Sequence, residues 1–409
     1  MKVLHNIGQL VTLEGGVRRG ESMRNLGIIE NAAVVFNDRI VDYGDSDEIL
    51  KEYRDAEKID AKGRVVMPGF VDPHTHAIFA GSRENELQMK IEGKSYMEIL
   101  KSGGGILYTV RMTRKAREDE LFRQTEKRLN TMLLHGTTTV EIKTGYGLDA
   151  KTEMKMLNVI DELSRKHVMD IVPTFLGAHA VSIGKKPMEV VDEMISIIPE
   201  AAKKAKYIDV FCEKGVFNVE ESRVYLEEGK KHGMIPKIHA DEIAYIGCTS
   251  LALEIGAISV DHLVKTPDDV IEKLGRSNIA CVFLPGTPFV LMSNEYPRAR
   301  KFIESNAIVA LATDLNPNCY TENMQIIITL AMLNMKMSVE ECISASTINA
   351  AYAIGMEKEV GSIEKGKKAD MIILDAKNYK QLGYHYGVNL VDTVIKNGEI
   401  VVSHGTLVK

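Results

Sequence analysis

Four histidines and one aspartate each stand at or just after the end of a run of apolar, largely β-branched residues. His74 and His76 follow the first such run, and His239, His262 and Asp314 close three later ones. Runs of this kind are typical of buried parallel strands, which bring their last side chains to one rim of a sheet. Taken singly, each histidine is better explained as a strand end or a satisfied core residue. Taken together, with His74 and His76 on one strand face, the set predicts a site for a divalent transition metal.

These residues need a scaffold in which strands alternate with helices, and the middle of the chain has that pattern. Residues 151–167, for example, place Met154, Leu157, Ile160 and Leu163 at helical spacing. Eight apolar runs separated by such segments predict an α/β fold, a (β/α)8 barrel of the TIM type, with the polar residues on the rim that carries active sites. The predicted strands are residues 65–71, 138–143, 171–176, 208–212, 235–239, 258–262, 280–284 and 308–314.

Both ends of the chain are rich in short strands instead. Residues 32–44 predict a hairpin. A second hairpin is predicted around Lys396-Asn397-Gly398, because Asn-Gly tolerates positive φ angles. The pattern indicates a small β-sandwich domain assembled from both termini beside the barrel. The expected boundaries are residues 1–62 with 350–409 for the small domain and residues 63–349 for the barrel.

The bulk composition is that of a soluble globular protein. Of the 409 residues, 45% are hydrophobic and 26% are charged, and the net charge is −6. This charge, in the absence of basic stretches, argues against nucleic acid and anionic membranes as partners. No apolar run reaches the roughly 18 residues that a membrane span needs, and the first residues do not resemble a signal peptide.

The five cysteines lie far apart and form no Cys-x-x-Cys motif. Such usage is typical of a reduced intracellular protein and not of a disulfide framework or a zinc ribbon. Cys212 and Cys281 fall within apolar runs, so we expect them to be small core residues. A cytoplasmic enzyme is therefore expected.

A long segment, residues 79–113, separates the first predicted strand from the second and contains Ser102-Gly103-Gly104-Gly105. Clustered glycines can form a phosphate-binding loop, but no Gly-Lys-Ser/Thr follows them here. A flexible turn or mobile loop is the favoured interpretation of this stretch.

The His-x-His pair on strand one, single histidines on strands five and six, and the aspartate on strand eight resemble the amidohydrolase superfamily of metal-dependent hydrolases. The resemblance covers the whole chain, including its β-rich ends. Within that superfamily, sequences around the barrel rim are similar to those of the imidazolonepropionases, the ring-opening hydrolases of histidine degradation. The segments that carry this similarity are residues 71–76, 81–84, 103–107, 143–148, 177–180, 237–242, 284–287, 312–317 and 384–387.

The resemblance implies a metal ion, and the end of strand four favours one ion per chain. Two-metal relatives commonly place a carboxylated lysine there, where this chain has Phe211-Cys212-Glu213. Lys143, at the end of strand two, is then a structural or substrate-loop residue. A set of three histidines and one aspartate binds Zn²⁺ or Fe, so the sequence does not distinguish between the two metals. The implied ligands are His74, His76, His239 and Asp314.

The resemblance also assigns catalytic roles. A single bound ion lowers the pKa of its water and supplies hydroxide at neutral pH. Asp314 would take the proton and pass it to the leaving nitrogen. His262 would hydrogen-bond the attacked carbonyl oxygen or the hydroxide, and Glu242 would contact the N–H groups of the ring.

By the same resemblance, the substrate is a small molecule, 4-imidazolone-5-propanoate, whose cyclic amide is opened to N-formimino-L-glutamate. A carboxylate tail suits a planar bidentate donor, which points to Arg83. Relatives often carry small residues where this chain has Asn318 and Cys319, a departure from the family pattern. The implied substrate-binding residues are Arg83, Tyr146, His179, Glu242, Asn316, Asn318 and Cys319.

Two other functions fit parts of the pattern. An aminohydrolase of a purine or pyrimidine ring would use the same ligands, but its substrates usually lack a carboxylate, so Arg83 and Tyr146 discriminate against it. A non-catalytic assembly protein on the same barrel would typically have lost metal ligands, which are intact here. A homodimer is expected from the family resemblance alone.

Overall fold

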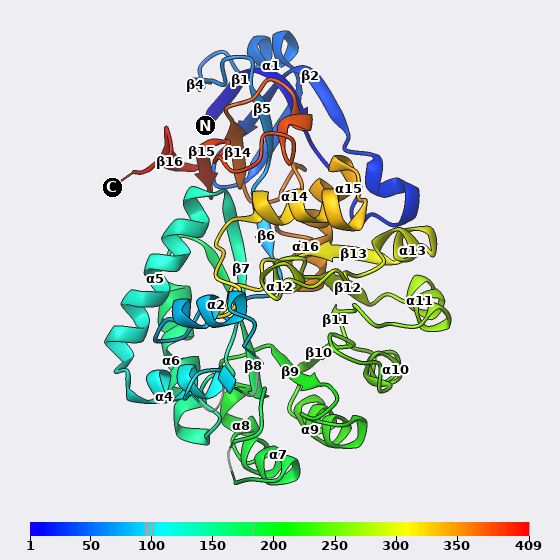
Figure 1. The fold of residues 1–409 in the computed structure, drawn as a ribbon. Helices are drawn as coiled ribbons and strands as arrows, with labels where there is room; N and C mark the ends of the chain where they lie inside the picture. Colours follow the sequence, from blue (N-terminus) through cyan, green and yellow to red (C-terminus); the bar gives the residue numbers. More distant parts are fainter. Residues whose placement is uncertain (95–97, 100–101, 183, 409) are drawn as a thin grey trace.

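The computed structural model describes residues 1–409 except 95–97, 100–101, 183 and 409. Figure 1 shows a small sheet that holds both chain ends and, below it, a larger sheet ringed by helices. Within the described residues the larger sheet has eight parallel strands paired in unbroken chain order, which confirms the predicted barrel. Its strands are β6 Phe70–Asp72, β7 Thr137–Lys143, β8 Asp170–Ala178, β9 Tyr207–Cys212, β10 Ile235–Ala240, β11 Ser259–His262, β12 Ala280–Phe283 and β13 Ile308–Leu311.

The first and last strands of the barrel meet at its rim. Thr75 forms a parallel bridge with Leu315, and the amide of His76 donates to the carbonyl of Leu315 at 2.9 Å. The buried carboxylate of Asp72 accepts hydrogen bonds from the amide and hydroxyl of Thr313, at 3.2 and 2.6 Å. These contacts close the barrel and bring the C-terminal ends of β6 and β13 side by side.

Helices between the strands cover the outside of the barrel (Figure 1). In α6 three residues of the predicted apolar stripe, Leu157, Ile160 and Leu163, are buried and the fourth, Met154, is half-buried. Asp149 caps the helix by accepting from the amide of Thr152 at 2.7 Å. The helices are α2 Glu84–Ile91, α4 Ile106–Lys115, α5 Glu118–Leu134, α6 Ala150–Lys166, α7 Pro187–Ile195, α8 Ile198–Ala201, α9 Val219–Lys231, α10 Cys248–Ile255, α11 Asp268–Gly275, α12 Gly286–Val290, α13 Ala299–Glu304, α14 Met324–Met335, α15 Val339–Ala345 and α16 Ile348–Ala353.

The small sheet is built from both ends of the chain, and an apolar cluster that includes Leu10, Phe36 and Ile395 packs residues from both ends together. Both predicted hairpins are present, and the turn of the second has Asn397 at φ 49° and Gly398 at φ 75°. The strands are β1 Lys2–Val11, β2 Ile28–Phe36, β3 Ile40–Asp45, β4 Glu57–Asp60, β5 Val65–Pro68, β14 Met371–Leu374, β15 Val391–Lys396, β16 Glu399–Ser403 and β17 Thr406–Leu407, with α1 Ser46–Glu52 beside them.

The apolar run 65–71, predicted as one strand, is divided between the two sheets. β5 pairs with β1 and β14 in the small sheet, whereas β6 pairs with β7 in the barrel. The break falls at Gly69, where a Cβ atom would lie 2.4 Å from side-chain atoms of Thr138. The prediction of a single strand is wrong because an apolar run signals burial and not the sheet that the strand joins.

Two of the cysteines form a disulfide bond. Cys212 ends β9 and Cys248 begins α10, 36 residues later in the sequence, with their Cα atoms 5.8 Å apart. The expectation of unpaired cysteines is therefore wrong for this pair, because the neighbouring strands β9 and β10 bring together residues that the sequence separates. Cys281, Cys319 and Cys342 are free and buried.

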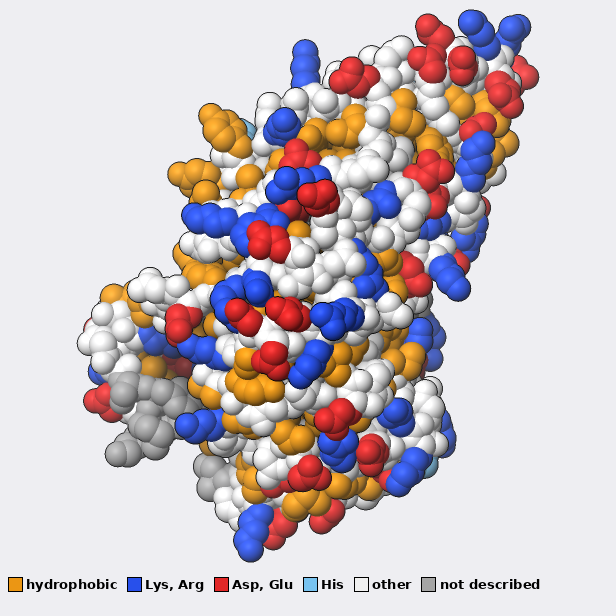
Figure 2. All heavy atoms as spheres, turned by 90° about the vertical axis from the view of Figure 1, so that its right-hand side faces the viewer, with side chains coloured by type: hydrophobic (Ala, Val, Ile, Leu, Met, Phe, Trp, Pro, Cys, Tyr) orange, Lys and Arg blue, Asp and Glu red, His pale blue; other side chains and the backbone are white. Residues whose placement is uncertain are grey.

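On the face shown in Figure 2, Lys and Arg side chains are interspersed with Asp and Glu side chains. Exposed ion pairs at the start of α13 have the same character, since Arg298 and Lys301 both contact Asp268. Among the described residues, no helix combines the length and apolar character needed to cross a membrane.

Candidate metal centre

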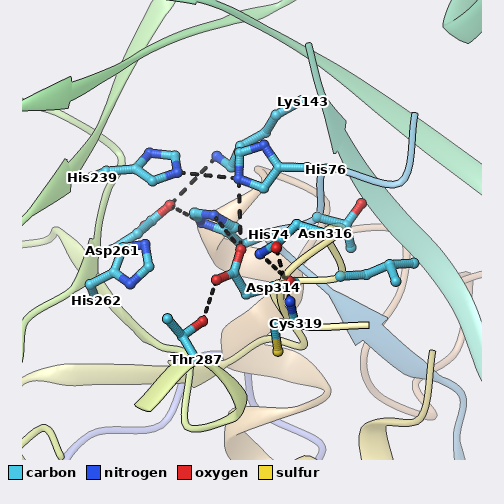
Figure 3. Close-up of polar contacts among 12 residues, drawn as sticks. His74, His76, Lys143, His239, Asp261, His262, Thr287, Asp314, Asn316 and Cys319 are labelled. Carbon is cyan, nitrogen blue, oxygen red and sulfur yellow. Dashed lines mark hydrogen bonds and ion pairs between the residues drawn. The ribbon is translucent and has the colours of Figure 1, made fainter. Parts of the chain in front are cut away.

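The C-terminal ends of β6, β10 and β13 bring four potential metal ligands together (Figure 3). His74 and His76 follow β6, His239 lies in β10, and Asp314 follows β13. One ring nitrogen from each histidine lies within 4.8 Å of the others. Oδ1 of Asp314 is 3.6 Å from Nε2 of His74 and 3.7 Å from Nε2 of His76. Three imidazoles and one carboxylate therefore converge on a single point.

These donor atoms fit a divalent metal ion. Nε2 of His76 lies 3.4 Å from Nε2 of His239, and Nε2 of His74 is buried without a hydrogen-bond partner among the described residues. Burial holds the pKa of His74 and of His76 well below its usual range, and neighbouring positive charge adds to the shift in both. Neutral imidazoles such as those of His74 and His76 are suitable ligands for zinc or iron, whereas for His239 the effect of burial is outweighed by Asp209, which raises the pKa of that ring.

Two buried aspartates contact the other ring nitrogens of two of these histidines. Oδ2 of Asp261 is 2.7 Å from Nδ1 of His74, and Oδ2 of Asp209 is 3.1 Å from Nδ1 of His239. Carboxylates in this position set the tautomer and orientation of a ligating imidazole. Sequence reasoning missed both aspartates. The sequence feature that could have identified them is a carboxylate inside an otherwise apolar predicted strand.

Lys143, which ends β7, supplies positive charge between these carboxylates. Its Nζ atom is 2.7 Å from Asp209, 3.0 Å from Glu141 and 3.5 Å from Asp261, and all four side chains are fully buried. Lys237 contacts the same Glu141 at 2.9 Å. Burial opposes the charge of Lys143, but Asp209 and Glu141 outweigh it and raise the pKa of Lys143. Lys143 is thus part of a buried ion network beneath the metal ligands.

The backbone and neighbours of Asp314 orient its carboxylate. The hydroxyl of Thr287 donates to Oδ2 of Asp314, and Oδ1 is the oxygen that lies near His74 and His76. Asp314 has φ 52° and His262 has φ 81°, both in the left-handed region. Non-glycine residues in that region cost about 1–3 kcal/mol each and cluster at functional sites. The two strand ends are therefore strained where they carry chemistry-bearing side chains.

His262 and Glu242 form a pair beside the metal ligands. Nδ1 of His262 is 3.7 Å from Oε2 of Glu242. Burial raises the pKa of Glu242, His262 opposes the shift, and Asp314 adds to it. A carboxyl group with a raised pKa beside an imidazole is suited to proton exchange with that imidazole or with a bound ligand.

A cavity of about 350 Å³ lies over this cluster. The ring of His179 stacks on that of His76, with centroids 4.8 Å apart and planes 12° apart. Nδ1 of His179 is 2.8 Å from the carbonyl of Gly145, and burial lowers the pKa of His179 to about 4, so the ring is neutral. The side chains that line the cavity include Arg83, Lys90, Tyr146, His179, Glu242, Asn316 and Asn318.

Cys319 is the implied substrate residue that does not line this cavity. Its buried thiol is 3.6 Å from the carbonyl of Thr313. The Asn316 side chain shapes the loop, because it donates to the carbonyl of Asp314 at 2.8 Å and accepts from the amides of Asn318 and Cys319 at 2.7 and 2.9 Å. The direction of the Cys319 side chain depends on these loop bonds, which the sequence does not reveal.

Two cationic side chains, Arg83 and Lys90, also line the cavity. Glu86 binds Arg83 through two hydrogen bonds, 2.9 Å from Nε and 2.6 Å from Nη2, and also accepts from the amide of Gly105 at 2.8 Å. Lys90 lies one turn further along α2 and donates to Oδ1 of Asn318. Sequence reasoning missed Glu86 and Lys90. The signal was their spacing, because residues 83, 86 and 90 share one helix face.

Comparison with known proteins agrees with this geometry. The profile of the amidohydrolase family matches residues 65–401. The imidazolonepropionases of Bacillus cytotoxicus and Bacillus thuringiensis are each 47% identical to this chain, over 98% of it and 97% of theirs. Among solved structures, a zinc-bound adenosine deaminase from Xanthomonas campestris has a TM-score of 0.78 at 16% identity, covering 100% of this chain and 94% of that one. E. coli guanine deaminase has a TM-score of 0.72 at 14% identity, covering 98% and 99%.

At such low identity, the likeness to the two deaminases shows the fold alone. The likeness to the imidazolonepropionases establishes family membership, because the identity is 47% and extends over nearly the full length of both chains. The family profile in turn spans the whole barrel. The chain therefore belongs to the amidohydrolase family and, within it, to the imidazolonepropionase family.

Proposed function

We propose that the protein hydrolyses 4-imidazolone-5-propanoate to N-formimino-L-glutamate in histidine degradation. The observation that carries this proposal is one cavity that is lined both by members of the histidine–aspartate cluster and by the cations Arg83 and Lys90. A flat ring amide with a carboxylate tail matches that polarity. The end-to-end identity with imidazolonepropionases from Bacillus supports the same reaction.

The cluster would hold one divalent ion, Zn²⁺ or Fe. When bound, such an ion supplies Lewis acidity and lowers the pKa of water toward neutrality. Asp209 and Asp261 would keep two of the imidazoles oriented toward it, and Lys143 would balance the charge of both aspartates. The proposed ligands are His74, His76, His239 and Asp314.

The chain's own groups would then move protons and stabilise charge. The water oxygen bonds to the ring carbonyl carbon, the adjacent ring C–N bond breaks, and that carbon becomes a carboxylate of the product. Asp314 accepts the proton of the water and delivers it to the leaving nitrogen. His262 hydrogen-bonds the oxygen on which negative charge develops. Glu242, in contact range of His262, holds a ring N–H group.

Arg83 and Lys90 would bind the propanoate tail. Glu86 engages the Nε–Nη2 edge of Arg83, so a ligand carboxylate would meet Nη1. Burial, and then the charge of Arg83, lowers the pKa of Lys90. A bound carboxylate would offset the repulsion between these two cations. Tyr146 and His179 would flank the ring, and Asn316 and Asn318 would border the newly formed carboxylate.

The proposal includes three further properties that come from the sequence and the family resemblance. The small domain would comprise residues 1–62 with 350–409, and the barrel domain residues 63–349 apart from β5, which pairs within the small sheet. The protein would form a homodimer, which light scattering of the purified protein measures. It would act in the cytoplasm, which fractionation of the source cells tests.

The reaction can be tested by incubating the metal-loaded protein with 4-imidazolone-5-propanoate. We expect the imidazolone absorbance to fall while N-formimino-L-glutamate appears in equal amount by mass spectrometry. Adenine, guanine and cytosine serve as comparison substrates, with ammonia as the measured product. Release of ammonia from one of these bases, without opening of the imidazolone, would replace this proposal with a ring deaminase.

A further inference from the structure

The loop that carries Glu242 is held by a carboxylate from the neighbouring strand. The loop, residues 241–247, joins β10 to α10. Glu213 follows β9 directly and is fully buried. Its Oε2 atom accepts the amide of Ile243 at 3.0 Å, and its Oε1 atom accepts the amide of Ala244 at 3.0 Å. The two residues that follow Glu242 are thus bound to one side chain.

Glu213 is itself held in place. Its Oε1 atom also accepts the amide of Lys214 at 2.8 Å, and its own amide donates to the carbonyl of Phe217 at 3.0 Å. The residue before it, Cys212, is bonded to Cys248 at the far end of the loop. The loop is therefore fastened to the end of β9 at two places, the carboxylate of Glu213 and the disulfide bond.

The first residue of the loop, Asp241, has an unfavourable backbone conformation that its side-chain contacts stabilise. Asp241 has φ 57°, in the left-handed region. Its Oδ2 atom accepts the hydroxyls of Thr249 at 2.5 Å and Thr266 at 2.8 Å. A non-glycine residue keeps such a backbone angle only where its surroundings enforce it. Glu242 is the next residue, so its direction depends on these contacts.

We propose that Glu213 is a positioning residue that acts through Glu242, with the Cys212–Cys248 disulfide as the second fastening of the same loop. The inference rests on the proposed role of Glu242 in the reaction. Oε2 of Glu242 lies 3.7 Å from Nδ1 of His262, and a displacement of about 1 Å at a reacting group can reduce the rate about 10²-fold. Glu213 is not among the residues that form the metal cluster, so its loss should leave metal binding intact.

The test compares two isosteric variants on neighbouring elements. Glu213→Gln replaces one acceptor oxygen with an NH2 group. An NH2 group cannot accept a hydrogen bond, so the bond from the amide of Ile243 or of Ala244 is lost. Glu221→Gln is the matched control, because Glu221 also accepts a backbone amide, that of Asn218 at 2.8 Å, but serves only the start of α9. Metal content and thermal midpoint are recorded for each, so that unfolded or metal-depleted protein is recognised.

The loop itself gives the first readout, which needs no substrate. Hydrogen–deuterium exchange of peptides that cover residues 241–250 should be faster in Glu213→Gln than in wild type or Glu221→Gln. Unchanged exchange in Glu213→Gln would overturn the proposal. Because this readout is independent of turnover, it tests the inference even if wild type fails to open imidazolone propanoate, which would refute the proposed function alone.

Kinetics give the second readout. Glu213→Gln should lower kcat by up to about 10²-fold with a small change in KM, since the proposed tail-binding residues Arg83 and Lys90 belong to the segment of α2 and not to this loop. In a Glu242→Gln background the same substitution should cost little more, because the residue through which it acts is already lost. Equal losses in both backgrounds would show a general structural role and contradict the inference. A Cys212→Ala/Cys248→Ala variant should show the same pattern with a smaller loss.

Discussion

Oδ2 of Asp261 lies 2.7 Å from Nδ1 of His74, on the side of the ring opposite to Nε2, the nitrogen that lies near Asp314. Asp261 belongs to β11, and His74 follows β6, so this contact crosses the interior of the barrel. The orientation of one proposed metal ligand therefore depends on a strand that lies three positions away around the barrel.

This relationship predicts that Asp261→Asn weakens metal binding without abolishing it. The side-chain oxygen of asparagine can still accept a hydrogen bond from the ring. The substitution removes the negative charge, however, and that charge makes the imidazole a stronger metal ligand. We expect metal affinity to fall roughly 10–100-fold, measured by competition with a chelator. Asp269→Asn, at an exposed position of α11, is the control. Wild-type affinity in Asp261→Asn would contradict the assigned role.

Loss of a ligand and loss of His262 should have separate consequences. His239→Ala should remove the metal, because it deletes one of four donors. His262→Asn should retain the metal and lose turnover by roughly 10²–10³-fold, since it removes a hydrogen bond to the developing oxyanion. Elemental analysis and kcat for both variants check this. If His262→Asn emptied the site, His262 would have to be counted as a ligand.

Lys143→Met should destabilise the fold. Its removal leaves the buried carboxylates of Asp209 and Asp261 without their lysine counterion, while Glu141 keeps its contact with Lys237; such a loss typically costs about 3–5 kcal/mol. Urea denaturation measures the free energy of unfolding. Lys166→Met, which breaks a surface pair with Glu162, should change it by no more than about 0.5 kcal/mol. Similar values for both variants would refute the buried network as a source of stability.

The tail-binding residues should affect substrate affinity more than the chemical step. Arg83→Met should cost about 2–4 kcal/mol in kcat/KM, mostly through KM, and Arg83→Lys should recover only part of it. Lys90→Met should raise KM in the same way, whereas Lys94→Met, at an exposed position beyond α2, should not.

A ring without the propanoate provides the control for these variants. Imidazolone lacking the tail should be a poor substrate for wild type and should scarcely distinguish wild type from Arg83→Met or Lys90→Met. Equal losses on the full and truncated substrates would show that neither residue binds the tail.

The sequence predicted the site residues that are marked by their immediate neighbours in the chain. His74, His239 and Asp314 follow apolar runs, and the order of those runs predicts the barrel rim. Asp209 and Asp261 were missed because a carboxylate inside a strand meets its partner only when strands assemble: Asp209 contacts His239 on the adjacent strand, and Asp261 contacts His74 across the barrel.

The other omissions also depend on contacts between distant segments. Lys90 lies in a long insertion, and its position over the cavity depends on how α2 packs, as its bond to Asn318 shows. The Cys212–Cys248 bond and the division of the run 65–71 between two sheets likewise follow from tertiary packing. Neither can be predicted from the local sequence.

The most direct test is a metal titration of the metal-free protein during turnover of 4-imidazolone-5-propanoate. The initial rate of ring opening should rise linearly with added Zn²⁺ or Fe²⁺ and reach its maximum at one ion per chain, with N-formimino-L-glutamate as the product. A maximum at two ions per chain, with Lys143 or Lys214 carboxylated, would contradict the single-ion site. Absence of ring opening at every metal content would contradict the proposed function.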